Sequence, residues 1–229
     1  MYYTSIGYFL IFTALIITII ADVFLRTRYS KYQKVKIKSE ITGAEAARQI
    51  LAANGLENVY VVETKGYLND HYDPRQKVVR LSTKVYHEAS IASVAVAAHE
   101  CGHAIQDKEN YLPMKIRSFL VPFASFGTRF GYIAVLIGLL FGAFNIAWIG
   151  VFLLGFILLF QLATLPVEFD ASRRGKNILK KEHILDTNES VGASKVLTAA
   201  AMTYVASLLS TVFDLLRLVL LLTNNNDRW

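Results

Sequence analysis

Cysteine is almost absent from this chain of 229 residues: Cys101 stands alone, which excludes an intramolecular disulfide. Low-complexity segments and internal repeats are missing too. Charged residues make up only 18% of the chain, whereas hydrophobic residues make up 54% and the mean hydropathy is +0.37. This composition is too apolar for an ordinary soluble domain, so a membrane protein is expected.

The apolar residues are concentrated in four blocks, each long enough to cross a bilayer as a helix at about 1.5 Å per residue. We therefore expect a mainly α membrane protein with about four transmembrane helices. The first block lacks a basic leader and a small-residue cleavage site, so we expect it to be kept as an anchor. The blocks are Tyr8–Leu25, Phe119–Phe144, Ala147–Leu165 and Val196–Leu222.

Lysine and arginine are distributed unevenly between the connections. Residues 1–7 and the connection between the second and third blocks carry none, whereas 26–117 and 173–195 are basic. The positive-inside rule places both basic segments in the cytoplasm and both termini outside, which predicts a multi-pass protein of the cell membrane. Topology thus explains the net charge of +6, and the expected partner is the bilayer rather than nucleic acid.

Four charged residues interrupt the blocks: Asp22, Arg129, Asp214 and Arg217. Such charges can mark a substrate or ion pathway, or can pair inside the bundle or near an interface, as Asp214 and Arg217 at i,i+3 could. Because Arg129 divides the second block, two interpretations of the second span stay open: the whole block, or 131–144 preceded by a tilted or interfacial stretch of helix. These residues are not assigned to the active site.

The segment from Lys31 to Arg117 is expected to form a small α+β portion. Thr42 and Glu45 predict a capping box for a helix that ends at Asn54-Gly55. Residues 59–63 and 77–83 read as strands, with a turn at 69–74. The stretch 75–82 is either an exposed edge that could pair with an extended substrate or an internal strand of a hairpin. We expect segments with the bounds 1–30, 31–117, 118–165, 166–195 and 196–229.

The motif that decides the function is His99-Glu100-Cys101-Gly102-His103, an H-E-x-x-H sequence in a small, apolar helical context. On a helix the two histidines lie one turn apart on the same face and can bind one metal ion, while Glu100 can reach a water molecule on that ion. Zn²⁺ lowers the pKa of such a water to about 7, and the carboxylate can accept its proton. The pattern indicates metal-assisted hydrolysis, most often of a peptide bond.

A catalytic zinc ion usually has three protein ligands, and the extended motif that supplies a third histidine fails here because Gln106 stands three residues after His103. Two carboxylates, Glu168 and Asp170, follow the third block. Glu168 is the better candidate, and Asp170 lies roughly on the opposite helix face, so both cannot readily bind one ion.

Two stretches, Ala98–Gln106 and Val167–Ser172, resemble the neutral zinc metallopeptidases of bacterial membranes, the YugP-like family, and Tyr72–Arg75 and Val79–Ser82 extend the resemblance over nearly the whole chain. The chain is more distantly similar to HtpX-like and CAAX-processing membrane proteases. The resemblance implies a cytoplasmic zincin-like catalytic portion with Glu168 as third ligand. Ser172 departs from those distant relatives, which carry an aspartate there.

We therefore expect a zinc endopeptidase in which His99, His103 and Glu168 bind one Zn²⁺, Glu100 activates water, and proteins or peptides are substrates. A non-catalytic scaffold with a closed zinc site is the alternative, and a small transporter is disfavoured because inverted repeats are missing. Cys101 is expected to be a packing residue, and His71 and His87 surface residues. Candidates for stabilising the oxyanion are His183, Arg173, Arg174 and Tyr204.

Overall fold

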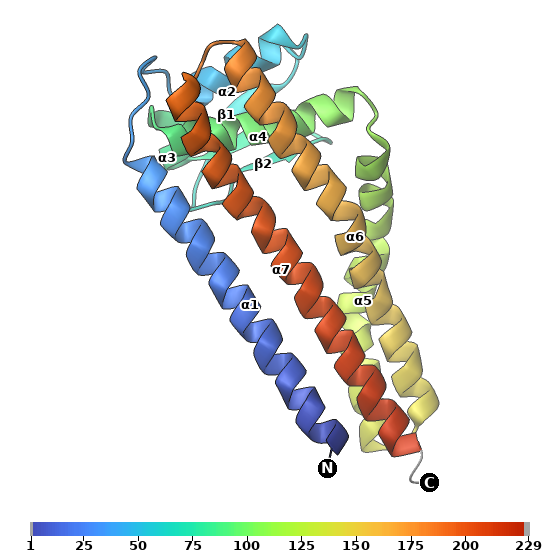
Figure 1. The fold of residues 1–229 in the computed structure, drawn as a ribbon. Coiled ribbons are helices and arrows are strands. Elements are labelled where there is room, and N and C mark those ends of the chain that lie inside the picture. The colour runs from blue at the N-terminus through green and yellow to red at the C-terminus, as the bar shows by residue number, and fades with distance from the viewer. Residues whose placement is uncertain (1, 227–229) are drawn as a thin grey trace. The chain divides into compact units, whose positions relative to one another are not determined.

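The computed structural model describes residues 2–226 and is mainly helical, with one small sheet (Figure 1). Ten elements follow one another along the chain: α1 (Tyr2–Gln33), α2 (Gly43–Ala53), β1 (Tyr60–Thr64), β2 (His71–Asp73), β3 (Val78–Ser82), α3 (Thr83–His87), α4 (Ile91–Lys108), α5 (Leu112–Leu140), α6 (Phe144–Lys181) and α7 (Thr187–Asn226). By length and composition, α1, α5, α6 and α7 could each cross a membrane. The expected mainly α membrane protein with about four such helices is confirmed.

The chain divides into two compact units, which are described separately. The first comprises residues 1–22, 115–165 and 203–229, and the second comprises 23–114 and 166–202. The five segments expected from the sequence stay a prediction.

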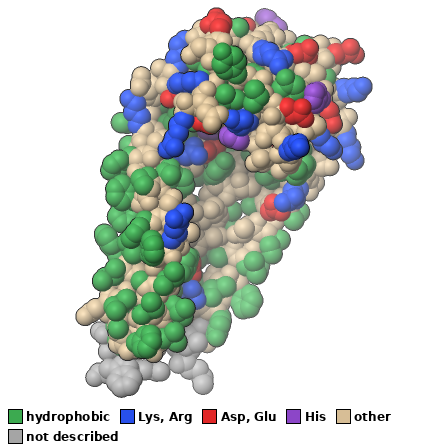
Figure 2. Space-filling model, turned by 180° about the vertical axis from the view of Figure 1, so that it is seen from behind, with side chains coloured by type: hydrophobic (Ala, Val, Ile, Leu, Met, Phe, Trp, Pro, Cys, Tyr) green, Lys and Arg blue, Asp and Glu red, His purple; other side chains and the backbone are tan. Residues whose placement is uncertain are grey.

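In the first unit, α5 and α6 pack closely because glycine lies where the two backbones meet. A Cβ atom added at Gly127 would lie 2.3 Å from the carbonyl oxygen of Leu153, and one at Gly138 would lie 2.5 Å from the backbone nitrogen of Ala147. Close approach through small residues is the usual way in which membrane helices associate. Hydrophobic side chains cover much of the face of these long helices seen in Figure 2.

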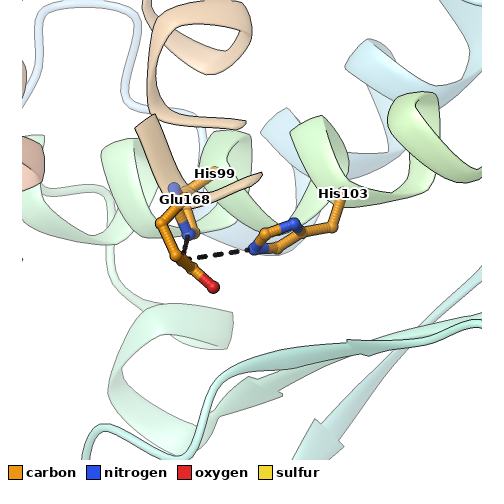
Figure 3. A group of neighbouring side chains, drawn as sticks. All are labelled: His99, His103 and Glu168. Atoms are coloured by element: carbon orange, nitrogen blue, oxygen red, sulfur yellow. Dashed lines mark hydrogen bonds and ion pairs between the residues drawn. The ribbon is translucent and has the colours of Figure 1, made fainter. Parts of the chain in front are cut away.

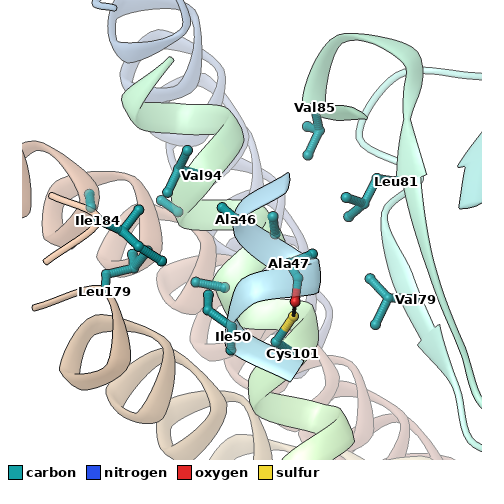
Figure 4. Packing of buried hydrophobic residues seen from close by; sticks show 14 of the residues in the cluster. Ala46, Ala47, Ile50, Val79, Leu81, Val85, Val94, Cys101, Leu179 and Ile184 are labelled. Carbon is teal, nitrogen blue, oxygen red and sulfur yellow. Dashed lines mark hydrogen bonds between the residues drawn. The ribbon is translucent and has the colours of Figure 1, made fainter. Parts of the chain in front are cut away.

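The second unit is built around α4, whose residues from Ile91 to Gln106 are nearly all buried. Helix α2 begins at the predicted capping box, in which the Thr42 hydroxyl accepts from the backbone of Glu45 and the Glu45 carboxylate accepts from the backbone of Thr42. It packs against α4 through Ala46, Ala47 and Ile50 (Figure 4). Cys101 is fully buried in this cluster, and its thiol lies 3.6 Å from the carbonyl oxygen of Ala47, as expected of a packing residue.

The sheet has the strand order β1-β3-β2, with β1 parallel and β2 antiparallel to β3. The stretch 75–82 is therefore an internal strand, and the open edges belong to β1 and β2. The turn expected at 69–74 was wrong for most of its length, because His71–Asp73 pairs with β3. The chain bends before β2, at 65–68, and turns after it, at 74–77, where the Asp73 carboxylate accepts from the backbone of Arg75.

Candidate metal centre

Helix α4 places His99 and His103 side by side. The helix starts at Ser90, whose hydroxyl accepts from the backbone nitrogen of Ser93, and continues without a break through both histidines. Because they are four residues apart, the two imidazoles lie on one face, with ring centroids 4.7 Å apart. Both side chains are largely buried, at 13% and 10% exposure, so the pair forms a nearly enclosed site.

The third side chain of the site comes from α6, which meets α4 at two glycines. A Cβ atom at Gly102 would lie 2.6 Å from the carbonyl oxygen of Ala171, and one at Gly175 would lie 2.9 Å from that of Ala98. Because α4 and α6 touch backbone to backbone there, Glu168 reaches the histidines. Its Oε2 atom lies 3.2 Å from Nε2 of His99 and 3.6 Å from Nε2 of His103 (Figure 3).

These three side chains fit a single tetrahedral zinc ion. One donor atom from each lies within 4.8 Å of the others. Two ligand atoms on one tetrahedral Zn²⁺, each about 2.0–2.1 Å from the metal, are separated by roughly 3.3 Å. The two nitrogen-to-oxygen distances, 3.2 and 3.6 Å, are close to that value, so small movements would complete the coordination.

Each histidine is held through its other ring nitrogen. Nδ1 of His99 lies 3.1 Å from the hydroxyl of Ser172, and Nδ1 of His103 lies 3.0 Å from Oε1 of Gln106. The amide nitrogen of Gln106 already donates to the carbonyl oxygen of Val167 and to Asp170, so its oxygen is the acceptor and Nδ1 of His103 carries the proton. This tautomer leaves Nε2 free to bind a metal.

The electrostatics of the site favour positive charge at its centre. Burial alone would raise the pKa of Glu168, but hydrogen bonds from His103 and His99 outweigh it and hold that pKa well below its usual range. Burial opposes protonation of His103, yet its bond to Glu168 and the nearby Glu100 carboxylate raise its pKa. A carboxylate enclosed by two imidazoles suits a divalent cation.

Glu100 is buried next to this group and is not part of the three-residue cluster. Burial raises the pKa of its carboxyl, and the imidazoles of His99 and His103 only partly offset that effect. A carboxylate with a raised pKa is better matched to accepting and returning a proton near neutral pH than an ordinary surface glutamate.

Asp170 is not one of the three side chains of the metal-binding group. Its side chain, 4% exposed, accepts from Gln106 and forms ion pairs with Arg173 and Arg174. Arg174 also pairs with Glu109 at 2.6 Å. Asp170 thus anchors the glutamine that orients His103, which agrees with the expectation that it and Glu168 do not share an ion.

Of the four oxyanion candidates, His183 is not part of the metal-binding group among the described residues. Arg173 and Arg174 are paired with Asp170, and His183 is exposed in the turn after α6, with φ 52°. Tyr204 belongs to the other unit. His71 and His87 are exposed, as expected.

Gln106 is the functional residue that the sequence reasoning missed. It stands three residues after His103 and therefore on the same helix face, which is the signal that could have identified it. Sequence spacing does not reveal its other contacts, because Val167 and Asp170 lie 61 and 64 residues away.

Comparison with known proteins shows the family of the chain. The family model described as "putative neutral zinc metallopeptidase" matches residues 7–223. The protein named "Putative membrane protease YugP" of Bacillus subtilis (strain 168) is 43% identical over 219 residues, which cover 96% of this chain and 97% of that protein. No solved structure matches the chain. The chain therefore belongs to the family described as putative neutral zinc metallopeptidases.

Proposed function

We propose that this chain is a zinc-dependent endopeptidase of the membrane. The observation that carries the proposal is the enclosed group of His99, His103 and Glu168, with a second acid, Glu100, beside it and outside the donor set. Three protein ligands leave one coordination position for water, which is the arrangement of catalytic rather than structural zinc sites. The family and the bacterial relative named as a membrane protease support the same activity.

The metal ligands, the general base and the residues that orient the ligands have separate roles in this proposal. His99, His103 and Glu168 would hold one Zn²⁺, which when bound lowers the pKa of water and polarises a peptide carbonyl. Glu100 accepts the proton of the attacking water and later gives it to the leaving amine. Ser172 and Gln106 keep the two imidazoles in the required orientation.

The alternative is a non-catalytic scaffold with a closed zinc site. It needs a fourth protein ligand, for which Asp170 and His183 were the candidates. Asp170 is already bonded to Gln106, Arg173 and Arg174, and His183 is exposed beyond the end of α6. The described donors therefore favour the open, catalytic arrangement.

We further propose that the site faces the cytoplasm and acts on proteins or peptides at the membrane. The orientation rests on the basic segments 26–117 and 173–195: the first contains His99, Glu100 and His103, and the second begins five residues after Glu168. The proposed location is the plasma membrane of a bacterium, as the bacterial relative suggests.

Zinc content and proteolysis measured on the same sample test the proposal. The purified full-length protein in detergent should contain about one zinc per chain, cleave unfolded casein, lose both with a strong chelator and regain both when zinc is restored. X-ray absorption should report imidazole and carboxylate ligands plus one water. A full set of four protein ligands without cleavage would favour the scaffold.

A further inference from the structure

Arg129 is a charged side chain on a helix surface made otherwise of apolar groups. It lies on α5 in the first unit and is exposed, as are Phe126, Ile133 and Leu136, which are three, four and seven residues away and so on nearby parts of the helix surface. Within residues 2–226, Arg129 has no hydrogen-bond or ion-pair partner. Figure 2 shows basic side chains (blue) lying among hydrophobic ones on the face of the long helices.

The packing of α5 on α6 sets the depth of Arg129. It lies between Gly127 and Gly131, whose added Cβ atoms would touch the carbonyl of Leu153 and the side chain of Leu154. Those two leucines stand in the middle of 144–165, a run without a charged residue. At about 1.5 Å per residue this run matches the roughly 30 Å hydrocarbon core of a bilayer.

Arg129 therefore lies near the middle of the membrane, about 15 Å from either interface and farther than an arginine side chain can extend. Helix α5 is continuous from Leu112 to Leu140, so the residues before and after Arg129 belong to one helix. An unpaired guanidinium is unfavourable in hydrocarbon, and ionisable residues at such depth usually pair with an opposite charge.

The chain itself does not supply the missing anion among its described residues. Asp214 already accepts from Arg217 at 2.9 Å and from the hydroxyl of Tyr132 at 2.7 Å. Asp22 has an interaction of its own and stands only four residues before Arg26, near the charged end of α1. A second copy brings the same two acids, so it offers no free carboxylate at the depth of Arg129.

We infer that the α5 surface formed by Phe126, Arg129, Ile133 and Leu136 binds a transmembrane helix of another protein that carries an aspartate or glutamate near the bilayer centre. The guanidinium can donate two parallel hydrogen bonds to a carboxylate, and low polarity around the pair strengthens them. The exposed apolar neighbours provide the packing. This inference is independent of the proposed peptidase activity.

Binding of designed helices in vesicles tests the inference. The full-length protein, labelled at Lys34→Cys because Cys101 is buried, is placed in phosphatidylcholine vesicles with labelled leucine-alanine helices. The helices differ only in a central aspartate, asparagine or leucine, and binding is read by energy transfer. We expect the aspartate helix to bind at least about tenfold more tightly than the leucine helix.

The variant Arg129→Leu should lose this preference and Arg129→Lys should keep part of it. The control Ile16→Ala, which changes an exposed isoleucine of α1 outside the proposed surface, should keep it. Zinc content and melting temperature show whether Arg129→Leu is folded. Equal binding of the aspartate and leucine helices, or an unchanged preference in folded Arg129→Leu, overturns the inference. Self-association that depends on Arg129 overturns it as well, because the occupant is then a second copy.

Discussion

Gly102 of α4 lies against the backbone of Ala171 of α6 so closely that a methyl group at Gly102 would be 2.6 Å from the Ala171 carbonyl oxygen. This contact brings Glu168, three residues before Ala171, to the two histidines of α4. The metal site thus requires a glycine at position 102, which has no side chain, as well as the three ligand side chains.

Gly102→Ala should therefore damage the site although it changes no ligand. The added methyl must push α6 away from α4, which we expect to cost about 1–3 kcal/mol of stability and to weaken zinc binding at least about tenfold. Melting temperature and a competitive zinc titration measure both effects. Gly155→Ala is the matched control, because a Cβ at Gly155 meets nothing within 4 Å. Equal behaviour of the two variants would refute this role of Gly102.

Gln106→Ala should weaken zinc binding by roughly 10- to 100-fold, because His103 loses the acceptor that fixes its tautomer. A zinc titration with a chromophoric chelator provides the measurement. Gln76→Ala is the control, since Gln76 is exposed and its side chain accepts a hydrogen bond from Arg80 rather than from His103. Unchanged zinc affinity in Gln106→Ala would show that the glutamine does not orient the ligand.

Two substitutions at Ser172 should differ in their effect on zinc affinity. Ser172→Ala removes the partner of Nδ1 of His99 and should lower the affinity. Ser172→Asp supplies a stronger acceptor, as the resemblance to distant relatives suggests, and should preserve or raise it. The same titration measures the zinc affinity of both variants. A lower affinity in both would mean that the site requires a side chain as small as serine at this position.

The half-buried carboxyl of Asp70, which is not one of the three metal-binding side chains, predicts a pH dependence of stability. Burial raises its pKa, an effect that hydrogen bonds from the backbone nitrogen and hydroxyl of Ser82 partly offset. Because the folded pKa is higher than the unfolded one, the folded state binds the proton more tightly. The contribution of Asp70 to stability is therefore fully present below about pH 4 and is lost as the pH rises through the folded pKa.

Asp70→Asn removes this proton while keeping an acceptor for Ser82. The melting temperature of the wild type minus that of Asp70→Asn, measured over a pH series, should fall from about pH 4 upward. A difference that rises with pH would show that the pKa is lowered instead.

Site residues can be predicted from the sequence where their common position depends on local spacing. His99, Glu100 and His103 could be identified because i,i+4 spacing on a helix dictates their common face, and the capping box at Thr42 could be read in the same way. Glu168 was inferred from the missing third ligand and from resemblance, since nothing local links it to α4.

The features that escaped prediction depend on partners distant in the chain. Strand β2 has three residues among turn-forming neighbours and exists because β3 offers it a pairing edge. The role of Gln106 depends on α6, and the internal position of β3 depends on β1. Short-range sequence patterns do not reveal such tertiary contacts.

Comparing the wild type with Glu100→Gln tests the central claim most directly. Both proteins, purified in detergent, are assayed for bound zinc and for cleavage of unfolded casein. If Glu100 is the general base beside three intact ligands, both proteins bind equal zinc and only the wild type cleaves. Cleavage by Glu100→Gln at the wild-type rate would contradict the mechanism, and loss of zinc from this variant would place Glu100 among the ligands.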